Sequence, residues 1–123
     1  MITSFMTTAF ISDIHGNYEA LKAVLAGIDA MGITHIVCAG DVAGYYSEVN
    51  ACCDTLRERG IPTVMGNHDW YLGGGGACAR SRSVNDCLEY QRRVITPDNL
   101  AWLRGLPLQV QANGVRVVHG GWS

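Results

Sequence analysis

Apolar residues in the first half of the chain alternate between short continuous runs and stripes with helical spacing. The continuous runs lie at 9–11, 36–39 and 62–65, and runs of this length are typical of buried strands. Between them, apolar residues recur three or four positions apart over 21–31 and 47–59, and a glycine follows each stretch, as at the ends of many helices. The order strand, helix, strand, helix, strand predicts an α/β fold with a parallel sheet.

The second half carries signals for helix starts and for a hairpin. Four consecutive glycines at 73–76 predict a flexible loop and a candidate lid. Ser83-Val84-Asn85-Asp86 has the form of a capping box, and Thr96-Pro97-Asp98 joins a cap to a proline at the first helical position, so we expect a helix to begin at each. Two apolar runs over 108–118 flank Asn113-Gly114, which predicts a β-hairpin with a tight turn.

Composition and charge fit one domain spanning 1–123, and they argue against membrane and nucleic-acid partners. The apolar fraction is 48% and the mean hydropathy is +0.09. No apolar run approaches the ~20 residues that a membrane-spanning helix needs, so we expect no membrane association. The 9 Lys and Arg are balanced by 11 Asp and Glu, and the sequence lacks the basic stripe expected of a nucleic-acid binder.

The cysteines indicate free thiols rather than a structural framework. Their number, five, is odd, and no two are spaced as C-x-x-C, which argues against disulfides and against a zinc knuckle. We therefore expect buried or partly buried thiols and a location in the reducing cytoplasm. The five are Cys38, Cys52, Cys53, Cys78 and Cys87.

Metal-ligand side chains follow each predicted strand of the parallel sheet and the end of the hairpin. The groups are Asp13-Ile14-His15, Gly40-Asp41, Asn67-His68-Asp69 and His119. Ligands of α/β sheets bind at the carboxyl ends of the strands, where these groups would meet. Carboxylate oxygens and imidazole nitrogens suit Mn, Fe, Zn, Co or Ni, and one carboxylate can bridge two ions. One such group would be weak evidence, but four at strand ends predict a dinuclear metal site.

These motifs, in this order, resemble those of the calcineurin-like metallophosphoesterases, and most closely the small prokaryotic phosphodiesterase branch. The resemblance extends over the connecting segments and so covers essentially the whole chain. It implies the N-terminal part of a four-layer α/β/β/α sandwich, with a mostly parallel first sheet and a C-terminal β-hairpin. The segments that carry it are Asp13-Ile14-His15-Gly16-Asn17, 40–45, Gly66-Asn67-His68-Asp69, Val118-His119-Gly120-Gly121 and 95–100.

The resemblance also implies which residues hold two divalent transition-metal ions. Asp13, His15 and Asp41 would hold the first ion. Asp41 would bridge to the second ion, which Asn67 and His119 would also bind. In the family the chemistry is two-metal hydrolysis, in which a bridging hydroxide attacks phosphorus in line and both ions absorb the developing charge.

Two further residues have catalytic roles by the same resemblance. His68 would lie beside the phosphate, either as general acid to the leaving oxygen or as a phosphate contact. Asp69 would either orient His68 or cap the turn, and the sequence leaves both alternatives open. The expected substrate is a small phosphoester or a nucleotide. Gly44-Tyr45 replaces the Asp-Arg-Gly continuation of the serine/threonine phosphatases, which disfavours a phosphoprotein substrate.

The family's last motif, Gly-His-x-His, does not occur between His119 and Ser123. Each ion would then keep three of four protein ligands, and we expect a truncated domain. A sheet without its cover would expose a large apolar area, so we also expect a homo-oligomer, with strand exchange across a two-fold axis as one form of it. The alternative to a hydrolase is a catalytically inactive metal- or phosphate-binding fragment of the same fold.

Overall fold

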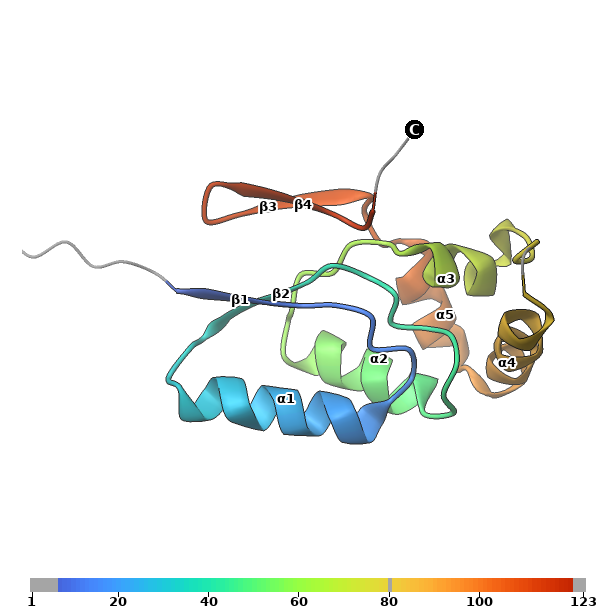
Figure 1. The fold of residues 1–123 in the computed structure, drawn as a ribbon, viewed down its shortest axis with the longest axis horizontal. Coiled ribbons are helices and arrows are strands. Elements are labelled where there is room, and N and C mark those ends of the chain that lie inside the picture. The colour runs from blue at the N-terminus through green and yellow to red at the C-terminus, as the bar shows by residue number, and fades with distance from the viewer. Residues whose placement is uncertain (1–6, 80, 121–123) are drawn as a thin grey trace, which may run out of the picture.

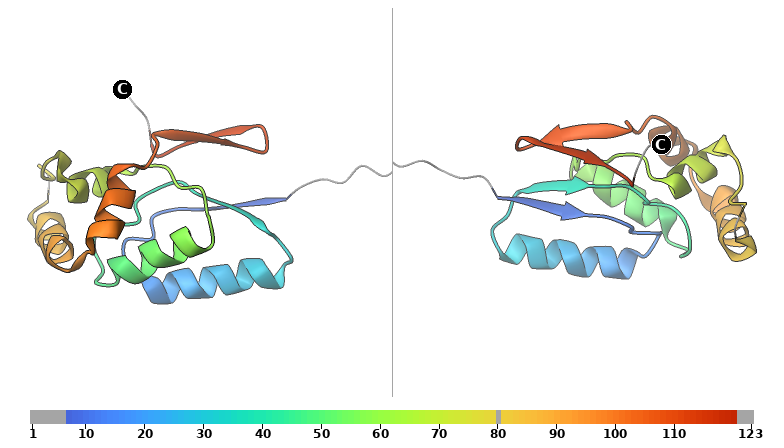
Figure 2. Two further views of the ribbon diagram at one scale, coloured as in Figure 1. Left: turned by 180° about the vertical axis from the view of Figure 1, so that it is seen from behind. Right: turned by 45° about the horizontal axis from the view of Figure 1, so that its top comes forward.

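A layer of helices covers one face of a parallel strand pair, and a β-hairpin lies over the other face (Figures 1 and 2). The computed structural model describes residues 7–79 and 81–120. Helices α3, α4 and α5 lie beyond the carboxyl ends of the parallel strands. The elements in chain order are β1 (Thr8–Ile11), α1 (Tyr18–Ala30), β2 (His35–Cys38), α2 (Val49–Glu58), α3 (Asn67–Trp70), the π-helical turn η1 (Tyr71–Gly75), α4 (Arg82–Val94), α5 (Pro97–Arg104), β3 (Gln109–Ala112) and β4 (Val115–Val118).

The parallel sheet confirms two of the three predicted strands. β1 and β2 pair in parallel, with Ala9 opposite Ile36. The predicted third strand at 62–65 makes a single parallel bridge between Cys38 and Thr63. The ladder does not continue, because Pro62 has no N–H to donate and the N–H of Gly66 donates to the Asp69 carboxylate, 2.9 Å away. The prediction of a third strand was therefore wrong in extent and right in position.

Two local predictions in the second half need correction. α4 begins at Arg82 rather than after Ser83, because the side chain of Ser81 is the cap and accepts from the N–H of Val84. The glycine segment at 73–76 is not a plain loop, since Tyr71–Gly75 continues α3 as η1. The start of α5 at Thr96-Pro97 is confirmed, and the Thr96 hydroxyl accepts from the N–H of Asn99.

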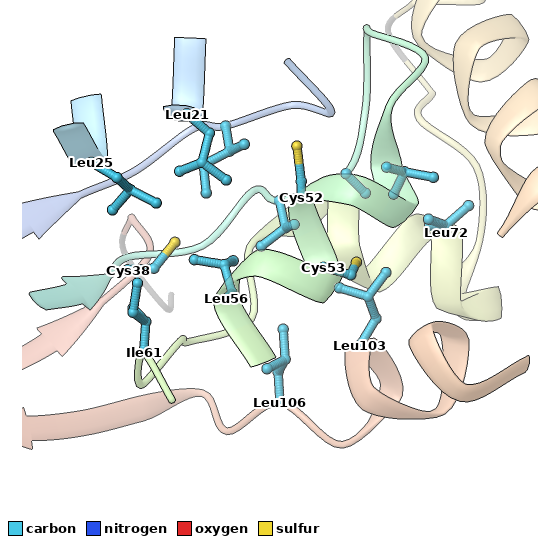
Figure 3. Close-up of a cluster of buried hydrophobic side chains, with 14 of the residues drawn as sticks. Leu21, Leu25, Cys38, Cys52, Cys53, Leu56, Ile61, Leu72, Leu103 and Leu106 are labelled. Carbon is cyan, nitrogen blue, oxygen red and sulfur yellow. The ribbon is translucent and has the colours of Figure 1, made fainter. Parts of the chain in front are cut away.

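The main hydrophobic core fills the space between the parallel strands and the helices (Figure 3). Three cysteines of this core, Cys38, Cys52 and Cys53, are fully buried free thiols. Burial raises the pKa of Cys38 and Cys52 to about 12, and it also raises the pKa of Cys53, so these thiols stay protonated at neutral pH. The labelled side chains are Leu21, Leu25, Cys38, Cys52, Cys53, Leu56, Ile61, Leu72, Leu103 and Leu106.

A second, small core joins the hairpin to the parallel sheet. The hairpin forms as predicted, and its turn residues have the left-handed backbone of a tight hairpin turn, with φ of 52° at Asn113 and 78° at Gly114. Val117 of β4 is buried against Val37 and Val64, which belong to the opposite layer. This contact fixes β4 over the sheet and therefore decides where the chain after it lies.

No helix among residues 7–79 and 81–120 is long and apolar enough to cross a membrane.

Truncation of Leu56 tests the main core. Leu56 lies on α2 and is fully buried. Leu56→Ala is expected to lower the free energy of unfolding by about 2–5 kcal/mol, because the deletion leaves a cavity that the surrounding helices only partly fill. Urea denaturation measures it. The control Met31→Ala, at a side chain that is 73% exposed, is expected to change stability by less than about 0.5 kcal/mol, and equal losses in both variants would contradict this description of the core.

Self-association stays a prediction, and apolar side chains in solvent support it. Phe10 is 49% exposed, Leu108 53% and Val115 49%, although all three belong to or adjoin strands. Light scattering at micromolar concentration is expected to give a mass above the 13.3 kDa of one chain. Leu108→Glu should lower that mass, whereas Met31→Glu on α1 should not. A monomeric mass for the unaltered chain would contradict the prediction.

Candidate metal centre

The loops after β1 and β2, the start of α3 and the end of β4 meet at the carboxyl ends of the parallel strands (Figure 1). Every side chain that the sequence singled out lies on one of these four segments. The parallel pairing of β1 with β2 brings the first two loops side by side, and the packing of Val117 brings the end of β4 to them. The expected convergence at the strand ends is therefore present in the fold.

The first two loops are hydrogen-bonded to each other through their backbones. The N–H of Asp13 donates to the carbonyl of Gly40 and that of His15 to the carbonyl of Asp41, both at 2.9 Å. Asp13, His15 and Asp41 each adopt the left-handed region, with φ of 59°, 51° and 57°. Such a conformation costs about 1–3 kcal/mol for a residue other than glycine, and it persists where surrounding bonds enforce it. Here it turns these side chains toward a common point.

Asp69 provides such bonds for the second loop, which carries Asp41. Its carboxylate is fully buried and accepts from the N–H groups of Asp41, Ala43 and Gly66, each at 2.9 Å. Burial raises the pKa of Asp69 to about 6, against the opposite effect of these N–H donors. Its hydrogen bonds are those of a cap that ties the second loop to α3. Among the described residues it makes no hydrogen bond to the ring of His68.

Carboxylates and imidazoles crowd around Asp41. Nε2 of His15 lies 3.3 Å from Oδ1 of Asp13 and 3.7 Å from Oδ2 of Asp41. Nε2 of His119 lies 3.3 Å from the same Oδ2. Asp41 is 4% exposed, whereas the side chain of Asp13 is 54% exposed. The result is a cluster of ligand atoms with one buried carboxylate at its centre.

In two of the histidines, His15 and His119, the ring nitrogen Nδ1 already has a hydrogen-bond partner. Nδ1 of His15 lies 2.8 Å from the carbonyl of Ala43, and Nδ1 of His119 lies 2.7 Å from the carbonyl of Ala39. A carbonyl only accepts, so Nδ1 carries the proton in both rings. Nε2 is then free to present a lone pair toward Asp41, as in histidines that ligate metals.

Asn67 adds an oxygen to this set. The amide oxygen of Asn67 points toward Asp41. It faces only acceptors, which are both carboxylate oxygens of Asp41 and Nε2 of His119, each 3.2 Å away. Lone pairs facing one another without a proton repel. A cation between them removes the repulsion, and in its absence only a reversed amide does so. The donor set of Asp41, Asn67 and His119 therefore fits a divalent ion.

Asp41 belongs to two groups of ligand atoms that could each hold a metal ion. One comprises His15, Asp41 and His68, and the other comprises Asp13, Asp41 and His119, with all ligand atoms of a group within 4.8 Å of one another. The family resemblance implied that Asp13 and His15 hold the same ion, and their ligand atoms lie 3.3 Å apart, while Asp13 is also grouped with His119. Partial burial raises the pKa of Asp13, but the Ser12 hydroxyl and both histidines outweigh it and hold that pKa below its usual value.

The ring of His68 lies against this cluster, but its Nδ1 makes no hydrogen bond to it. Its backbone N–H donates to Oδ1 of Asp41 at 3.0 Å, while its side chain is buried and Nδ1 has no hydrogen-bond partner among the described residues. Burial lowers the pKa of His68, with Asp41 acting in the opposite direction, so the ring is neutral near pH 7. An unpartnered buried nitrogen beside ligand atoms is suited to contact a substrate.

Gln91 is a functional residue that the sequence analysis missed. This fully buried side chain of α4 accepts from the N–H of Gly44 at 2.8 Å and donates to the carbonyls of Gly44 at 3.1 Å and Tyr46 at 2.5 Å. The signal was present, since a glutamine at 91 continues the apolar spacing of Val84 and Leu88 on α4. A polar side chain on an apolar helix face needs a buried partner, and here the partner is the second loop.

Glycine is required where the backbone approaches Asp41. A Cβ atom at Gly66 would overlap the Asp41 carboxylate, and one at Gly44, where φ is 99°, would overlap the His68 ring. Among the other glycines of the motifs, Gly121 lies outside the described residues.

The fold and the site define a phosphoesterase class, and the comparison with family models agrees. The model of the calcineurin-like phosphoesterases matches residues 6–123. The chain therefore belongs to the calcineurin-like phosphoesterase family.

Three known proteins show the range of the similarity. An uncharacterised protein of Methanocaldococcus jannaschii is 39% identical over 106 residues, which are 85% of this chain and 44% of that protein. The symmetrical bis(5'-nucleosyl)-tetraphosphatase of Neisseria gonorrhoeae is 30% identical over 129 aligned positions, covering 90% and 42%. A crystal structure of a metallophosphoesterase from Sphaerobacter thermophilus superposes with a TM-score of 0.70 at 29% identity, covering 89% and 44%. The chain thus spans less than half the length of these relatives.

Removal of the Asp69 charge tests the cap. An asparagine keeps the shape of the side chain but replaces one of two accepting oxygens by a donor, which faces an N–H group. Asp69→Asn is expected to cost about 1–3 kcal/mol for each buried N–H left without an acceptor. Thermal and urea unfolding measure this loss. Asp86→Asn, at an exposed position of α4, is the matched control, and equal stability of the two variants would rule out the cap as described.

Proposed function

We propose that the chain is a metal-dependent phosphoester hydrolase, a phosphodiesterase or phosphomonoesterase, with two divalent ions in its centre. The observation that carries the proposal is the position of the buried Asp41 carboxylate, whose Oδ2 lies 3.7 Å from Nε2 of His15 and 3.3 Å from Nε2 of His119. A single buried carboxylate between two sets of ligands is the arrangement of a bridged ion pair. Membership of the calcineurin-like phosphoesterase family supports the same reaction class.

Five side chains would hold the ions: Asp13, His15, Asp41, Asn67 and His119. Bound divalent ions of this kind supply positive charge to the phosphoryl oxygens and lower the pKa of water from 15.7 to about 7. The protein's part is to keep the ligands in place before the ions arrive. The carbonyls of Ala39 and Ala43 fix both histidine rings, and Asp69 fixes the loop that carries Asp41. Which of Mn, Fe, Zn, Co or Ni is bound depends on supply as much as on these ligands.

His68 would act on the substrate itself. Its ring lies 4.8 Å, centroid to centroid, from the ring of His15, so a phosphoryl group at the ligand cluster comes within its reach. A neutral ring donates one N–H to a phosphoryl oxygen, and a protonated ring gives its proton to the leaving oxygen. Both roles use the same position, and both require that the ring stay beside Asp41.

The name of one relative supports a nucleotide as the substrate of this chain. One relative is named a symmetrical bis(5'-nucleosyl)-tetraphosphatase, and this chain spans 42% of it. A small phosphoester or nucleotide is therefore the proposed substrate class. A cytoplasmic location, expected from the free thiols, stays a prediction.

Hydrolysis of bis-p-nitrophenyl phosphate by the purified chain with added Mn²⁺ tests the proposal. Asp41→Asn removes one bridging oxygen and is expected to reduce turnover by at least about a hundredfold, on the scale seen when one charge-stabilising group is lost. Asp86→Asn, on the exposed face of α4, is expected to keep full turnover. A chelator should abolish the activity, and Mn²⁺ should restore it.

Metal analysis of the same samples separates the two candidate functions. Two ions per chain with Asp41-dependent turnover would support the hydrolase. One ion or none, with a folded chain and no turnover in either protein, would favour the metal- or phosphate-binding alternative. Circular dichroism of Asp41→Asn excludes unfolding as the cause of a lost activity.

A further inference from the structure

Tyr45 combines backbone strain with an exposed aromatic ring. Its φ is 54°, in the left-handed region that a bulky residue rarely adopts, and it is 49% exposed. Such a conformation is strained for a residue other than glycine, and Tyr45 does not belong to either hydrophobic core. A strained residue outside the core calls for a functional explanation.

Gln91 holds Tyr45 in this conformation. It binds the residue before Tyr45 through both N–H and carbonyl, and the residue after it through the carbonyl. In addition, the N–H of Tyr46 donates to the carbonyl of His15 at 2.9 Å. The backbone on both sides of Tyr45 is therefore held by hydrogen bonds.

The ring of Tyr45 is placed beside the two histidines that face a substrate. Its centroid lies 4.8 Å from that of His15, edge-on at 89°, and 5.2 Å from that of His68, tilted at 49°. Beyond His68 the row continues with Tyr71, at 6.0 Å, and Trp70, at 5.7 Å from Tyr71. We name Tyr45, His68, Tyr71 and Trp70 the aromatic row. It runs from the ligand cluster toward solvent, since Trp70 is 51% exposed.

We propose that Tyr45 is a specificity residue that stacks on the aromatic group of the phosphoester, a nucleobase or an aryl ring. Resting on the proposed hydrolase function, this inference adds the substrate class. A phosphoryl group at Asp41 leaves its ester group next to Tyr45, and the exposed part of that ring offers an apolar, π-rich surface. Stacking of a base on an aromatic side chain is favourable and tolerates any base. An alkyl or sugar phosphate has no flat π face to stack on this surface.

Binding of two matched phosphate monoesters to the Mn²⁺-loaded chain tests the inference. AMP and ribose 5-phosphate share the sugar and the phosphate, and AMP alone has a base. Isothermal calorimetry is expected to show tighter binding of AMP to the unaltered chain. Tyr45→Gly removes the ring at a φ that glycine adopts without strain, and it is expected to weaken AMP about tenfold while leaving ribose 5-phosphate within about twofold.

Two further variants control for a general effect of tyrosine substitution on ligand binding. Tyr45→Phe keeps the ring and is expected to bind AMP like the unaltered chain. Tyr90→Leu removes a tyrosine of α4 that is 43% exposed and is expected to change neither affinity. If Tyr45→Gly does not fold, equal affinity of the unaltered chain for both ligands would still overturn the inference.

The outcomes separate this inference from the hydrolase function. Equal binding of AMP and ribose 5-phosphate, or equal weakening of both by Tyr45→Gly, would overturn the stacking role even where bis-p-nitrophenyl phosphate is hydrolysed. Selective weakening of AMP without hydrolysis by the unaltered chain would support the stacking role and count against the hydrolase function. Selective weakening together with a fall in kcat/KM for the aryl ester supports both.

Discussion

The carboxylate of Asp69 joins segments that are far apart in sequence, and the candidate centre depends on it. Two of its N–H donors belong to the loop after β2 and the third is Gly66, just before α3. Water cannot replace an acceptor at this depth, so each N–H group depends on the carboxylate for its partner. The backbone of Asp41, the residue shared by the two groups of candidate ligand atoms, is held by one of these bonds. A residue that binds no ion thus positions the one that would bind both.

The ligand cluster is an arrangement that stores unfavourable energy. Three candidate ligands, Asp13, His15 and Asp41, have left-handed backbones, and the amide oxygen of Asn67 faces the carboxylate of Asp41. The main core and the buried polar bonds of Asp69 and Gln91 supply the compensation. Such strain is typical of sites that are preorganised for a charged ligand. A cation would relieve the repulsion, so ion binding and folding should stabilise each other.

Much of the fold followed from local pattern, and the exceptions have identifiable causes. Strands β1 and β2, helices α1, α2 and α5 and the hairpin lie where apolar spacing and turn residues predict them. The third strand is reduced to one bridge because Pro62 has no N–H and the N–H of Gly66 donates to the Asp69 side chain. The cap of α4 is Ser81 and not Ser83, and the two serines offer the same local chemistry, so the local sequence did not select between them.

The sequence by itself determined the family and the candidate ligand residues, because the positions of Asp, His and Asn after successive strands are set by local order along the chain. It also showed that the groups would meet, since parallel strands share a carboxyl edge. Only the tertiary structure decided that Asp69 caps a turn rather than orienting His68, that Gln91 holds the second loop, and that Tyr45 lies against His15. The bonds of Asp69 to the second loop, the bonds of Gln91 and the contact of Tyr45 with His15 each span at least 26 positions, and local pattern carries no information about side-chain direction over that distance.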